Sequence, residues 1–484
     1  MQHILRKSVL TFLVFSFVAA ACGMLSGCNR ETETVGGNCR PCHTITLDTN
    51  HQLACSICHN GDPEARDKQK AHINLVEHPA HPDHLATTCG KCHANQAEQL
   101  PHARHYTLDK AVNLVRAAFG AKETLSSLID IPVSAEPENI TQLADDMLRR
   151  RCLRCHLFTP GDDYAATKRG TGCAACHMPF RFGKPTSHTF MAHPADQQCL
   201  ACHYGNRVGF DYYGRFEHDF NVEYRTPYTA APTTDRPYGV DYHDLVPDIH
   251  QQKGLSCIDC HSGAQLMTAS DPATIITCAD CHDAAKLAVK LPNGVLSDTN
   301  GYRLLVKSDG KKHPIPLLHH KAHFSETDVS CAACHAQWSF DDGKTYLLRA
   351  DIEDYENWAR LTVQGSSEIE RLLENNLNYA KEELPPMTTD TISYKKRLGI
   401  WYKGYSMRRW ETIPLGRAEN GIISVMRPEL NLSLSWIDEN EEIRFDGHDA
   451  EAANNGLLPY TPHTIGPAGI FYEERLRAFR KTEK

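Results

Sequence analysis

The sequence has no excess of positive charge, little methionine and only one long apolar run. It carries 51 Lys and Arg against 60 Asp and Glu, a formal charge of −9, which disfavours nucleic acid and anionic lipid head groups as partners. Its 9 methionines leave few thioether ligands for a metal. No run after residue 27 approaches the length of a membrane span, so we expect a soluble body.

Cysteine is almost absent outside one pattern. Of the 20 cysteines, 18 fall in nine copies of Cys-x-x-Cys-His, where the composition would give about 0.05 copies by chance. Only Cys22 and Cys28 lie outside, so no cysteine of the body remains for a disulfide. We number the copies motifs 1 to 9 in chain order: Cys39, Cys42 and His43; Cys55, Cys58 and His59; Cys89, Cys92 and His93; Cys152, Cys155 and His156; Cys173, Cys176 and His177; Cys199, Cys202 and His203; Cys257, Cys260 and His261; Cys278, Cys281 and His282; Cys331, Cys334 and His335.

Each motif has the spacing that attaches a haem group. Two thiols three residues apart lie about one helical turn apart, within reach of the two vinyl groups of one porphyrin. The histidine that follows then faces the iron as its proximal ligand. The sequence therefore predicts nine covalently attached haem c groups. Structural zinc and disulfide bridges are the alternatives, and both are disfavoured because a histidine follows every second cysteine.

Enough histidines remain for a second, distal ligand to every iron. Of the 28 histidines, one lies in the N-terminal leader and nine are proximal, which leaves 18 for nine distal positions. Each of these has an alternative role as a solvated or core side chain. Ligation by two histidines predicts low reduction potentials. Five candidates lie four to eight residues before the next motif, and six more lie elsewhere: His51, His84, His193, His250 and His323; His72, His78, His81, His188, His319 and His320.

The N-terminus predicts export. A basic start and an apolar stretch over 9–21 are typical of a secretory signal covering residues 1–27. Leu25-Ser26-Gly27-Cys28 resembles the bacterial lipobox, and this resemblance implies a lipidated tether over 28–38 that is anchored at Cys28. The alternative, an uncleaved anchor, is disfavoured because the apolar run is short. Asn29, where Asp would retain a lipoprotein at the inner membrane, favours the outer membrane at its periplasmic or cell-surface face.

The motifs lie in clusters at 39–93, 152–203, 257–282 and 331–335, and together they define a nine-haem cytochrome domain over residues 39–335. These 297 residues amount to 33 per haem, too few for a conventional core around each one. We therefore expect a mainly α fold with much irregular loop, in which the haems form the core, plus a small C-terminal α+β region.

Apolar periodicity predicts helices within 107–151, near 367–383 and over 472–481, and alternation over 422–445 predicts strands. Residues 336–484 have no cysteine, and either form a small domain or wrap back on the haem region. Their histidines, His448 and His463, are further possible distal ligands. The tyrosine-rich and arginine-containing segment 204–243 is either a substrate pocket over an open haem or aromatic packing, and we favour packing.

With the lipobox, the nine motifs resemble the multihaem c-type cytochromes of anaerobically respiring, often metal-reducing, bacteria. That resemblance implies electron transfer to other redox proteins or cytochromes, or to an extracellular acceptor. Locally, Gly254-Leu255-Ser256-Cys257 and Arg408-Arg409-Trp410-Glu411 resemble stretches of octahaem tetrathionate reductase and hydroxylamine oxidoreductase relatives. This second resemblance implies the alternative, a reductase with one open haem that acts on small nitrogen or sulfur oxyanions. Neither resemblance assigns a catalytic residue.

Overall fold

The computed structural model of the 484-residue chain divides into two compact units, Met1–Glu77 and His78–Lys484. The described residues are 39–217, 237–240, 242–268, 276–285, 297–299, 302–307, 310–339, 341–342, 344–352, 367–377, 384–405, 408–451, 456–468 and 471–483. The predicted signal and lipidation site, residues 1–38, therefore lie outside them. No helix in the described ranges is long and apolar enough to cross a membrane.

The first unit contains motifs 1 and 2 and no buried residue among 39–77. Its helices are α2 (Cys55–His59) and α3 (Lys68–Ala71), the second capped by the side chain of Asp67. Both helices are too short to be stable in isolation. The backbone N–H of Val76 donates to the His59 carbonyl at 2.7 Å, which ties the end of the unit to motif 2.

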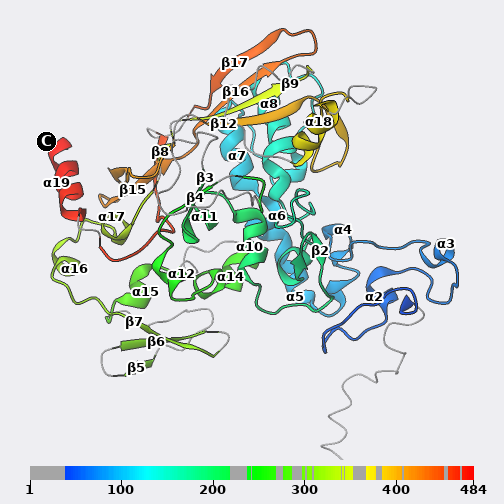
Figure 1. The fold of residues 1–484 in the computed structure, drawn as a ribbon, viewed down its shortest axis with the longest axis horizontal. Helices are drawn as coiled ribbons and strands as arrows, with labels where there is room; N and C mark the ends of the chain where they lie inside the picture. Colours follow the sequence, from blue (N-terminus) through cyan, green and yellow to red (C-terminus); the bar gives the residue numbers. More distant parts are fainter. Residues whose placement is uncertain are drawn as a thin grey trace, which may run out of the picture. The chain divides into compact units, whose positions relative to one another are not determined.

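The second unit begins with helices, which Figure 1 shows in blue to teal. The predicted helical region 107–151 contains α7 and α8, which confirms that prediction. The apolar positions of α7 point inward, since Val112 and Val115 are buried. The helices of this part are α4 (Pro82–Leu85), η2 (Cys89–Lys91), α5 (Ala94–Gln99), η3 (Leu100–His102), α6 (Arg104–Thr107), α7 (Asp109–Ala118), η4 (Leu128–Asp130), α8 (Ile140–Met147), the π-helical η5 (Leu148–Cys152) and η6 (Leu153–Cys155).

Motifs 5 to 9 follow on short helices separated by small antiparallel sheets. These strands pair as β1–β2, β3–β4 and β5–β6–β7. The elements are α9 (Ala174–His177), β1 (Phe180–Arg181), β2 (Lys184–Pro185), α10 (Asp196–His203), α11 (Gly209–Tyr212), β3 (Arg215–Glu217), β4 (Tyr242–Asp244), α12 (Ile249–Gln252), α13 (Cys257–Cys260), α14 (Gly263–Met267), α15 (Cys278–His282), β5 (Ser297–Thr299), β6 (Tyr302–Val306), β7 (Lys312–Ile315), α16 (Ala322–Ser325) and α17 (Cys331–His335).

The C-terminal part is rich in strands. A four-stranded sheet has the order β12-β9-β16-β17, in which β16 runs parallel to β9 and the other pairs are antiparallel. Strands β15 to β17 and helix α19 confirm those predictions, and α18 confirms the third helix as far as residue 377, since 378–383 lie outside the described residues. The elements are β8 (Asp341–Asp342), β9 (Thr345–Ala350), α18 (Ser367–Leu377), β10 (Met387–Thr389), β11 (Lys396–Leu398), β12 (Ile400–Tyr405), β13 (Arg408–Arg409), β14 (Leu415–Arg417), β15 (Ile423–Pro428), β16 (Leu432–Ile437), β17 (Ile443–Asp449), β18 (Leu457–Pro459) and α19 (Tyr472–Thr482).

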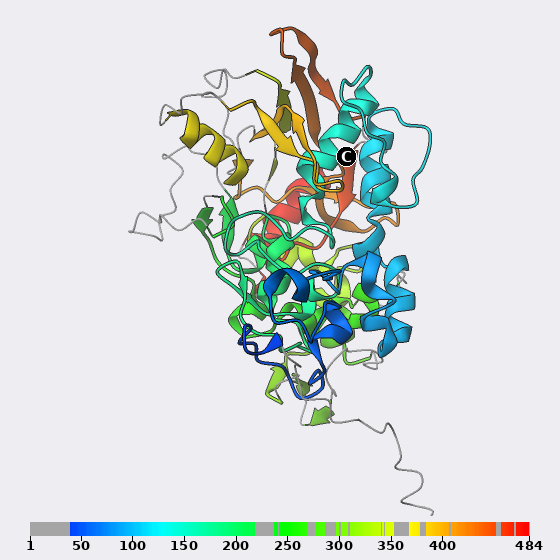
Figure 2. The same ribbon diagram turned by 90° about the vertical axis from the view of Figure 1, so that its right-hand side faces the viewer.

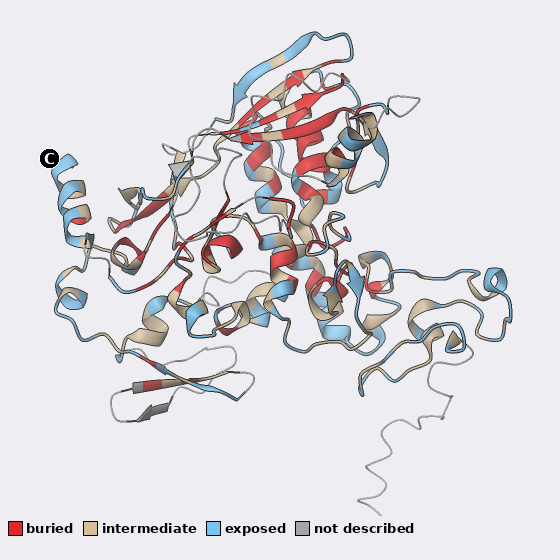
Figure 3. Ribbon diagram, viewed as in Figure 1, coloured by how far each residue is buried: buried red, intermediate tan, exposed pale blue. Residues whose placement is uncertain are grey.

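The largest apolar core lies between this sheet and the helices α7 and α8. Leu143 and Met147 of α8 share it with Trp401 of β12 and with Leu434 and Trp436 of β16. Figure 3 shows these elements in red, and Figure 2 shows the strands against the helices in a second view. The C-terminal strands thus pack on the segment between the first two motif clusters.

The predicted fold class, mainly α with the haems forming the core, is wrong. Helix takes up 34 % and strand 19 %, with several small sheets, so the protein is an α+β mix. The estimate of 33 residues per haem counted only residues 39–335. It missed that the strands after residue 344 supply apolar side chains, such as Trp401 and Leu434, which are both 0 % exposed. Together with α7 and α8 they build a core from protein alone.

Candidate haem-binding site

Each described motif is wound into about one turn, as attachment to a single porphyrin requires. In motifs 1, 3, 5 and 7 the histidine N–H donates to the carbonyl of the first cysteine at 2.8 to 3.0 Å. Motifs 2, 8 and 9 span the helices α2, α15 and α17 from first cysteine to histidine. All 18 motif cysteines are free thiols, so both sulfurs of every motif remain available for thioether bonds.

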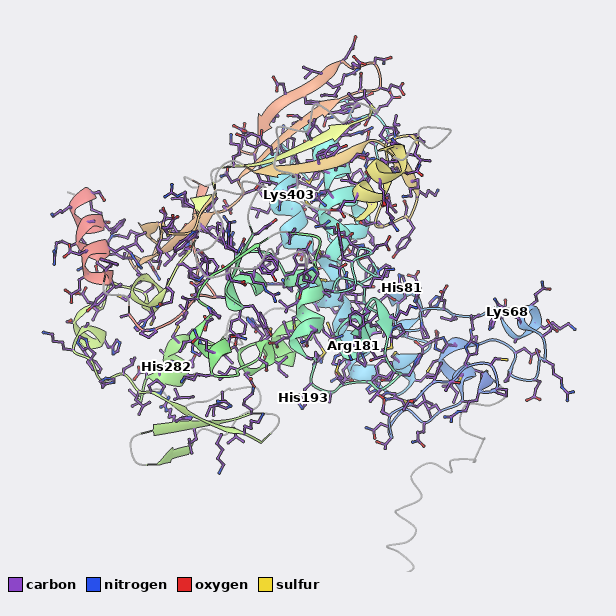
Figure 4. All side chains as sticks on the ribbon, in the orientation of Figure 1. Lys68, His81, Arg181, His193, His282 and Lys403 are labelled. Carbon is purple, nitrogen blue, oxygen red and sulfur yellow. The ribbon has the colours of Figure 1, made fainter. Side chains whose placement is uncertain are left out.

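Several proximal histidines are oriented by a hydrogen bond through Nδ1. Because the acceptor is a carbonyl oxygen, Nδ1 carries the proton and Nε2 keeps its lone pair for a metal. Such bonds fix both the tautomer and the ring direction of metal-binding histidines. The acceptors are the Val76 oxygen for His59 (2.8 Å), Met191 for His177 (2.7 Å), Pro316 for His282 (2.7 Å; Figure 4), Gly466 for His335 (2.9 Å) and the side-chain oxygen of Gln265 for His261 (3.2 Å).

Five proximal histidines face a second imidazole ring. In each pair the ring centroids lie 6.0 to 6.4 Å apart. An imidazole nitrogen binds a metal at about 2.0 Å and lies about 1.1 Å from its ring centroid, so two imidazoles on opposite sides of one ion have centroids about 6.2 Å apart. The pairs therefore have the separation that two axial ligands of one iron require. They are His43 with His72 (6.0 Å), His203 with His105 (6.0 Å), His282 with His250 (6.1 Å), His335 with His323 (6.1 Å) and His261 with His463 (6.4 Å).

Some of the second histidines are also oriented by a hydrogen bond through Nδ1, as the proximal ones are. His250 Nδ1 lies 2.8 Å from Asp248 Oδ1, and His105 Nδ1 lies 3.3 Å from the Leu266 oxygen. Burial is the main cause that lowers the pKa of His105 and of His463. Both rings are therefore neutral near pH 7, which is the form that binds a metal.

The predicted distal ligands divide into those with a described contact to a proximal histidine and the rest. Of the candidates, His72, His250 and His323 face a proximal histidine, and His250 faces that of motif 8 rather than the adjacent motif 7. Sequence proximity missed His105, and it gave His463 no preference over His448, which is exposed on β17. For the remaining candidates the described contacts are with other groups. His51 Nδ1 lies 2.7 Å from Asp48, and His319 Nδ1 lies 3.0 Å from the Leu317 oxygen. His81 and His84 face each other (6.3 Å), as do His320 and His323 (6.2 Å), whereas His188 is half-buried and His78 and His193 are exposed.

Motif 4 differs from these pairs. The ring of His156 is 1 % exposed, and burial lowers its pKa to about 4. Both of its nitrogens are hydrogen-bonded: Nε2 donates to the Thr391 oxygen at 3.1 Å, and Nδ1 accepts from the Phe158 N–H at 3.0 Å. Among the described side chains, the aromatic ring in contact with His156 is that of Phe158, with centroids 5.2 Å apart.

Thiols of different motifs meet in the structure. Hydrogen bonds join Cys39 to Cys55 in the first unit, and Cys155 to Cys202, Cys199 to Cys257 and Cys278 to Cys331 in the second. Burial is the main reason that the pKa values of Cys173, Cys176 and Cys260 are raised, and Cys89, Cys199 and Cys281 respectively raise them further. In the second unit these contacts give the order 3-5-6-7-8-9, with motif 4 beside motif 6.

Direct hydrogen bonds hold neighbouring motifs in this order. Asp196 of α10 accepts from the N–H of Cys257 at 2.9 Å, which joins motif 6 to motif 7. Gln198 of the same helix donates to the Met178 oxygen at 3.0 Å, next to motif 5. Arg154 of motif 4 donates to the hydroxyl of Tyr204, which follows motif 6, at 2.7 Å.

The environment of the thiols fits a bulky apolar group. Cys152 and Cys260 are exposed residues, yet the protein atoms packed around their thiols raise the pKa of both.

The tyrosine-rich segment packs as an aromatic cluster where it is described. Tyr204 and Tyr238 stack with centroids 4.9 Å apart, and Phe210 lies against both rings. This favours the packing alternative over a substrate pocket for these residues; residues 218–236 lie outside the described part. Nor do the described residues contain a group of three or more His, Cys, Asp or Glu side chains that would hold a bare metal ion.

Comparison of the chain with protein-family models, with curated proteins and with solved structures finds no significant match.

Proposed function

We propose that the protein is a multihaem c-type cytochrome that carries electrons through nine covalently attached haem c groups. The observation that carries the proposal is the set of five histidine pairs with centroids 6.0 to 6.4 Å apart, each containing the histidine of a Cys-x-x-Cys-His motif. Two other histidine pairs in the described residues, His81 with His84 and His320 with His323, have the same separation without a motif histidine, so the motif histidine, and not the distance alone, marks these five as ligand pairs. When bound, each haem iron takes up and releases one electron.

The protein's own residues have three tasks in this function. The cysteine pairs would hold each group by thioether bonds, and where two histidines are paired both would bind one iron, which favours a low reduction potential. Hydrogen bonds through Nδ1, such as that from His282 to the Pro316 oxygen, hold the ligand rings in place.

Contacts between motifs supply the path. A thioether bond holds the porphyrin edge at the sulfur, so motifs whose sulfurs meet carry neighbouring haems. In the second unit the path runs through motifs 3, 5, 6, 7, 8 and 9, and motif 4 joins it at motif 6. The excess of acidic residues favours basic redox proteins as partners. Cys28 would anchor the chain by lipid at the outer membrane, facing the periplasm or the cell surface.

A second candidate function is a reductase with an open iron, and motif 4 is the observation that favours it. His156 contacts Phe158 rather than a second histidine, and both of its nitrogens are hydrogen-bonded within the protein, so Nε2 would exchange its bond to the Thr391 oxygen for the iron when haem is bound. An iron with one histidine ligand has a position left for a small nitrogen or sulfur oxyanion. Electron transfer explains more of the structure, since it uses all five pairs.

The test is production of the full chain in a host that attaches haem c, followed by mass spectrometry and magnetic spectroscopy of the ferric protein. The proposal expects the mass of nine haems and mainly low-spin iron. A protein that carries zinc or disulfides in place of haem would refute it. A high-spin fraction near one ninth, together with turnover of nitrite, hydroxylamine, tetrathionate or sulfite, would favour the reductase instead.

A further inference from the structure

Arg169, between motifs 4 and 5, is a buried cation whose hydrogen-bond acceptors are all uncharged. Arg169 is only 4 % exposed to solvent. One terminal nitrogen, Nη2, donates to the His156 carbonyl and to the Thr159 hydroxyl, both at 3.0 Å, and at 3.4 Å to the Arg154 carbonyl. Nη1 donates to the Thr167 carbonyl at 3.2 Å, and Nε has no acceptor.

Neighbouring buried arginines are neutralised, whereas Arg169 is not. Arg149 pairs with Asp390 at 2.7 Å, Arg150 with Asp146 at 2.6 Å and Arg154 with Asp162 at 2.9 Å. Within the described chain, Arg169 forms no ion pair. Removing a cation from water without a partner is costly, so a protein keeps such a group where its charge has a use.

The charge lies among three motifs. Arg169 donates to the carbonyls of Arg154 and His156 in motif 4, the next residue, Gly170, lies against Ala174 of motif 5, and Arg154 in turn donates to Tyr204, which follows motif 6. Burial raises the pKa of the Cys176 thiol in motif 5 to about 11, and Arg169 opposes that rise. The hydrogen bond between Cys155 of motif 4 and Cys202 of motif 6 lowers the pKa of the first thiol and raises that of the second, and Arg169 lowers both.

We propose that the buried guanidinium of Arg169 is a fixed positive charge that raises the reduction potentials of the haems on motifs 4, 5 and 6. This inference rests on the proposed function, because it requires those three haems. A reduced haem carries one positive charge fewer than an oxidised one, so a nearby cation favours the reduced form. The effect is large at this place because the protein interior screens charge far less than water does.

The guanidinium is held by the carbonyl of His156, which fixes its position relative to one proximal ligand.

The consequence concerns the branch in the path. Motif 6 contacts motifs 4, 5 and 7, and is the point where the branch from motif 4 joins the chain. If the three haems around Arg169 have the higher potentials, electrons entering from motif 3 or motif 9 collect there before they leave. The haems of motifs 4, 5 and 6 then hold electrons between the two ends of the path.

Two variants of the haem-loaded full chain test the charge in independent ways. R169M removes the cation, and T159D leaves it in place but sets a carboxylate beside it, where the Thr159 hydroxyl now accepts from Nη2 at 3.0 Å. Potentiometric titration of the haem absorbance should show about one third of the amplitude, three haems of nine, moved to lower potential in both variants. R181M is the matched control, since Arg181 is exposed, and it should titrate as wild type.

Mass spectrometry establishes first that each protein carries nine haems. If R169M does not load fully, T159D decides the question alone. A fully loaded variant with unchanged potentials, or an equal shift in R181M, overturns the inference and leaves the proposed function standing. A wild-type protein without haem overturns both.

Discussion

His463, in the loop after β18, allows the sharpest test of the ligand pairs. Its ring lies 6.4 Å from that of His261 in motif 7, at an interplanar angle of 32°. The loop around it is anchored, because Ile465 N–H donates to Asp248 at 2.7 Å and Thr464 bonds the Trp338 carbonyl at 2.5 Å. Replacing the side chain therefore changes the ligand while the backbone stays in place.

In H463M a thioether replaces one imidazole, and methionine ligation raises the potential of a haem. Because one iron of nine is affected, we expect about one ninth of the redox amplitude, ~11 %, to move to higher potential. In H463A the same iron loses its sixth ligand, and about one ninth of the ferric iron should become high-spin. Potentiometric titration and electron paramagnetic resonance measure the two effects.

His448 supplies the matched control. It is the other histidine after residue 335, and it is exposed on β17. H448M and H448A should match wild type in both assays. The pairing is refuted if H463M and H463A carry nine haems and show neither change, or if the H448 variants show the same changes.

Three further predictions concern the scaffold. Asp390 is 0 % exposed and accepts from Arg149, so D390N should lower the free energy of unfolding in urea by about 3–5 kcal/mol at pH 7. Burial raises the pKa of Asp390, but hydrogen bonds from Arg149 and from backbone N–H groups outweigh this and hold the pKa below its usual range. The stabilisation by this carboxylate is therefore complete above about pH 4 and is lost as the pH falls below it. A stability difference between D390N and wild type that stays constant with pH would contradict this account. L434A should lower the free energy of unfolding by about 2–5 kcal/mol because Leu434 is 0 % exposed, whereas L457A, at a position 46 % exposed, should change it by no more than about 0.5 kcal/mol. Equal losses in the two variants would contradict the position of the core. Gly172 has a φ of +59°, and a Cβ there would overlap the Ala80 carbonyl, so the variant G172A should displace motif 5 and carry one haem fewer by mass. The control G205A, whose added Cβ meets nothing within 4 Å, should keep nine haems. Loss of haem from both variants would contradict the steric argument.

Local patterns in the sequence predicted the elements whose formation depends on neighbours along the chain. Apolar spacing over 107–151 corresponds to α7 and α8, and alternation over 422–445 corresponds to β15 to β17. The packing of these elements was not predictable in this way. Trp401 packs with Leu143 although 258 positions separate them in the sequence, and no periodicity records such a contact.

The same limit applies to the ligands. Proximity in sequence indicated His323, which faces the proximal histidine of the motif that follows it. It failed for His105 and His463, because each faces a motif far away in the sequence, 98 and 202 positions from its partner. The unpaired charge of Arg169 is also invisible in the sequence, where the residue differs in no way from its paired neighbours.

The core between α8 and β16 has a consequence for the order of assembly. Its two halves come from positions as far apart as Leu85 and Trp436, so it cannot form until most of the chain is available. An N-terminal-first chain delivers all nine motifs, which end at His335, before Trp401 and Leu434 arrive. If the motifs bind haem as proposed, their thiols are accessible for attachment before the last strands complete the core.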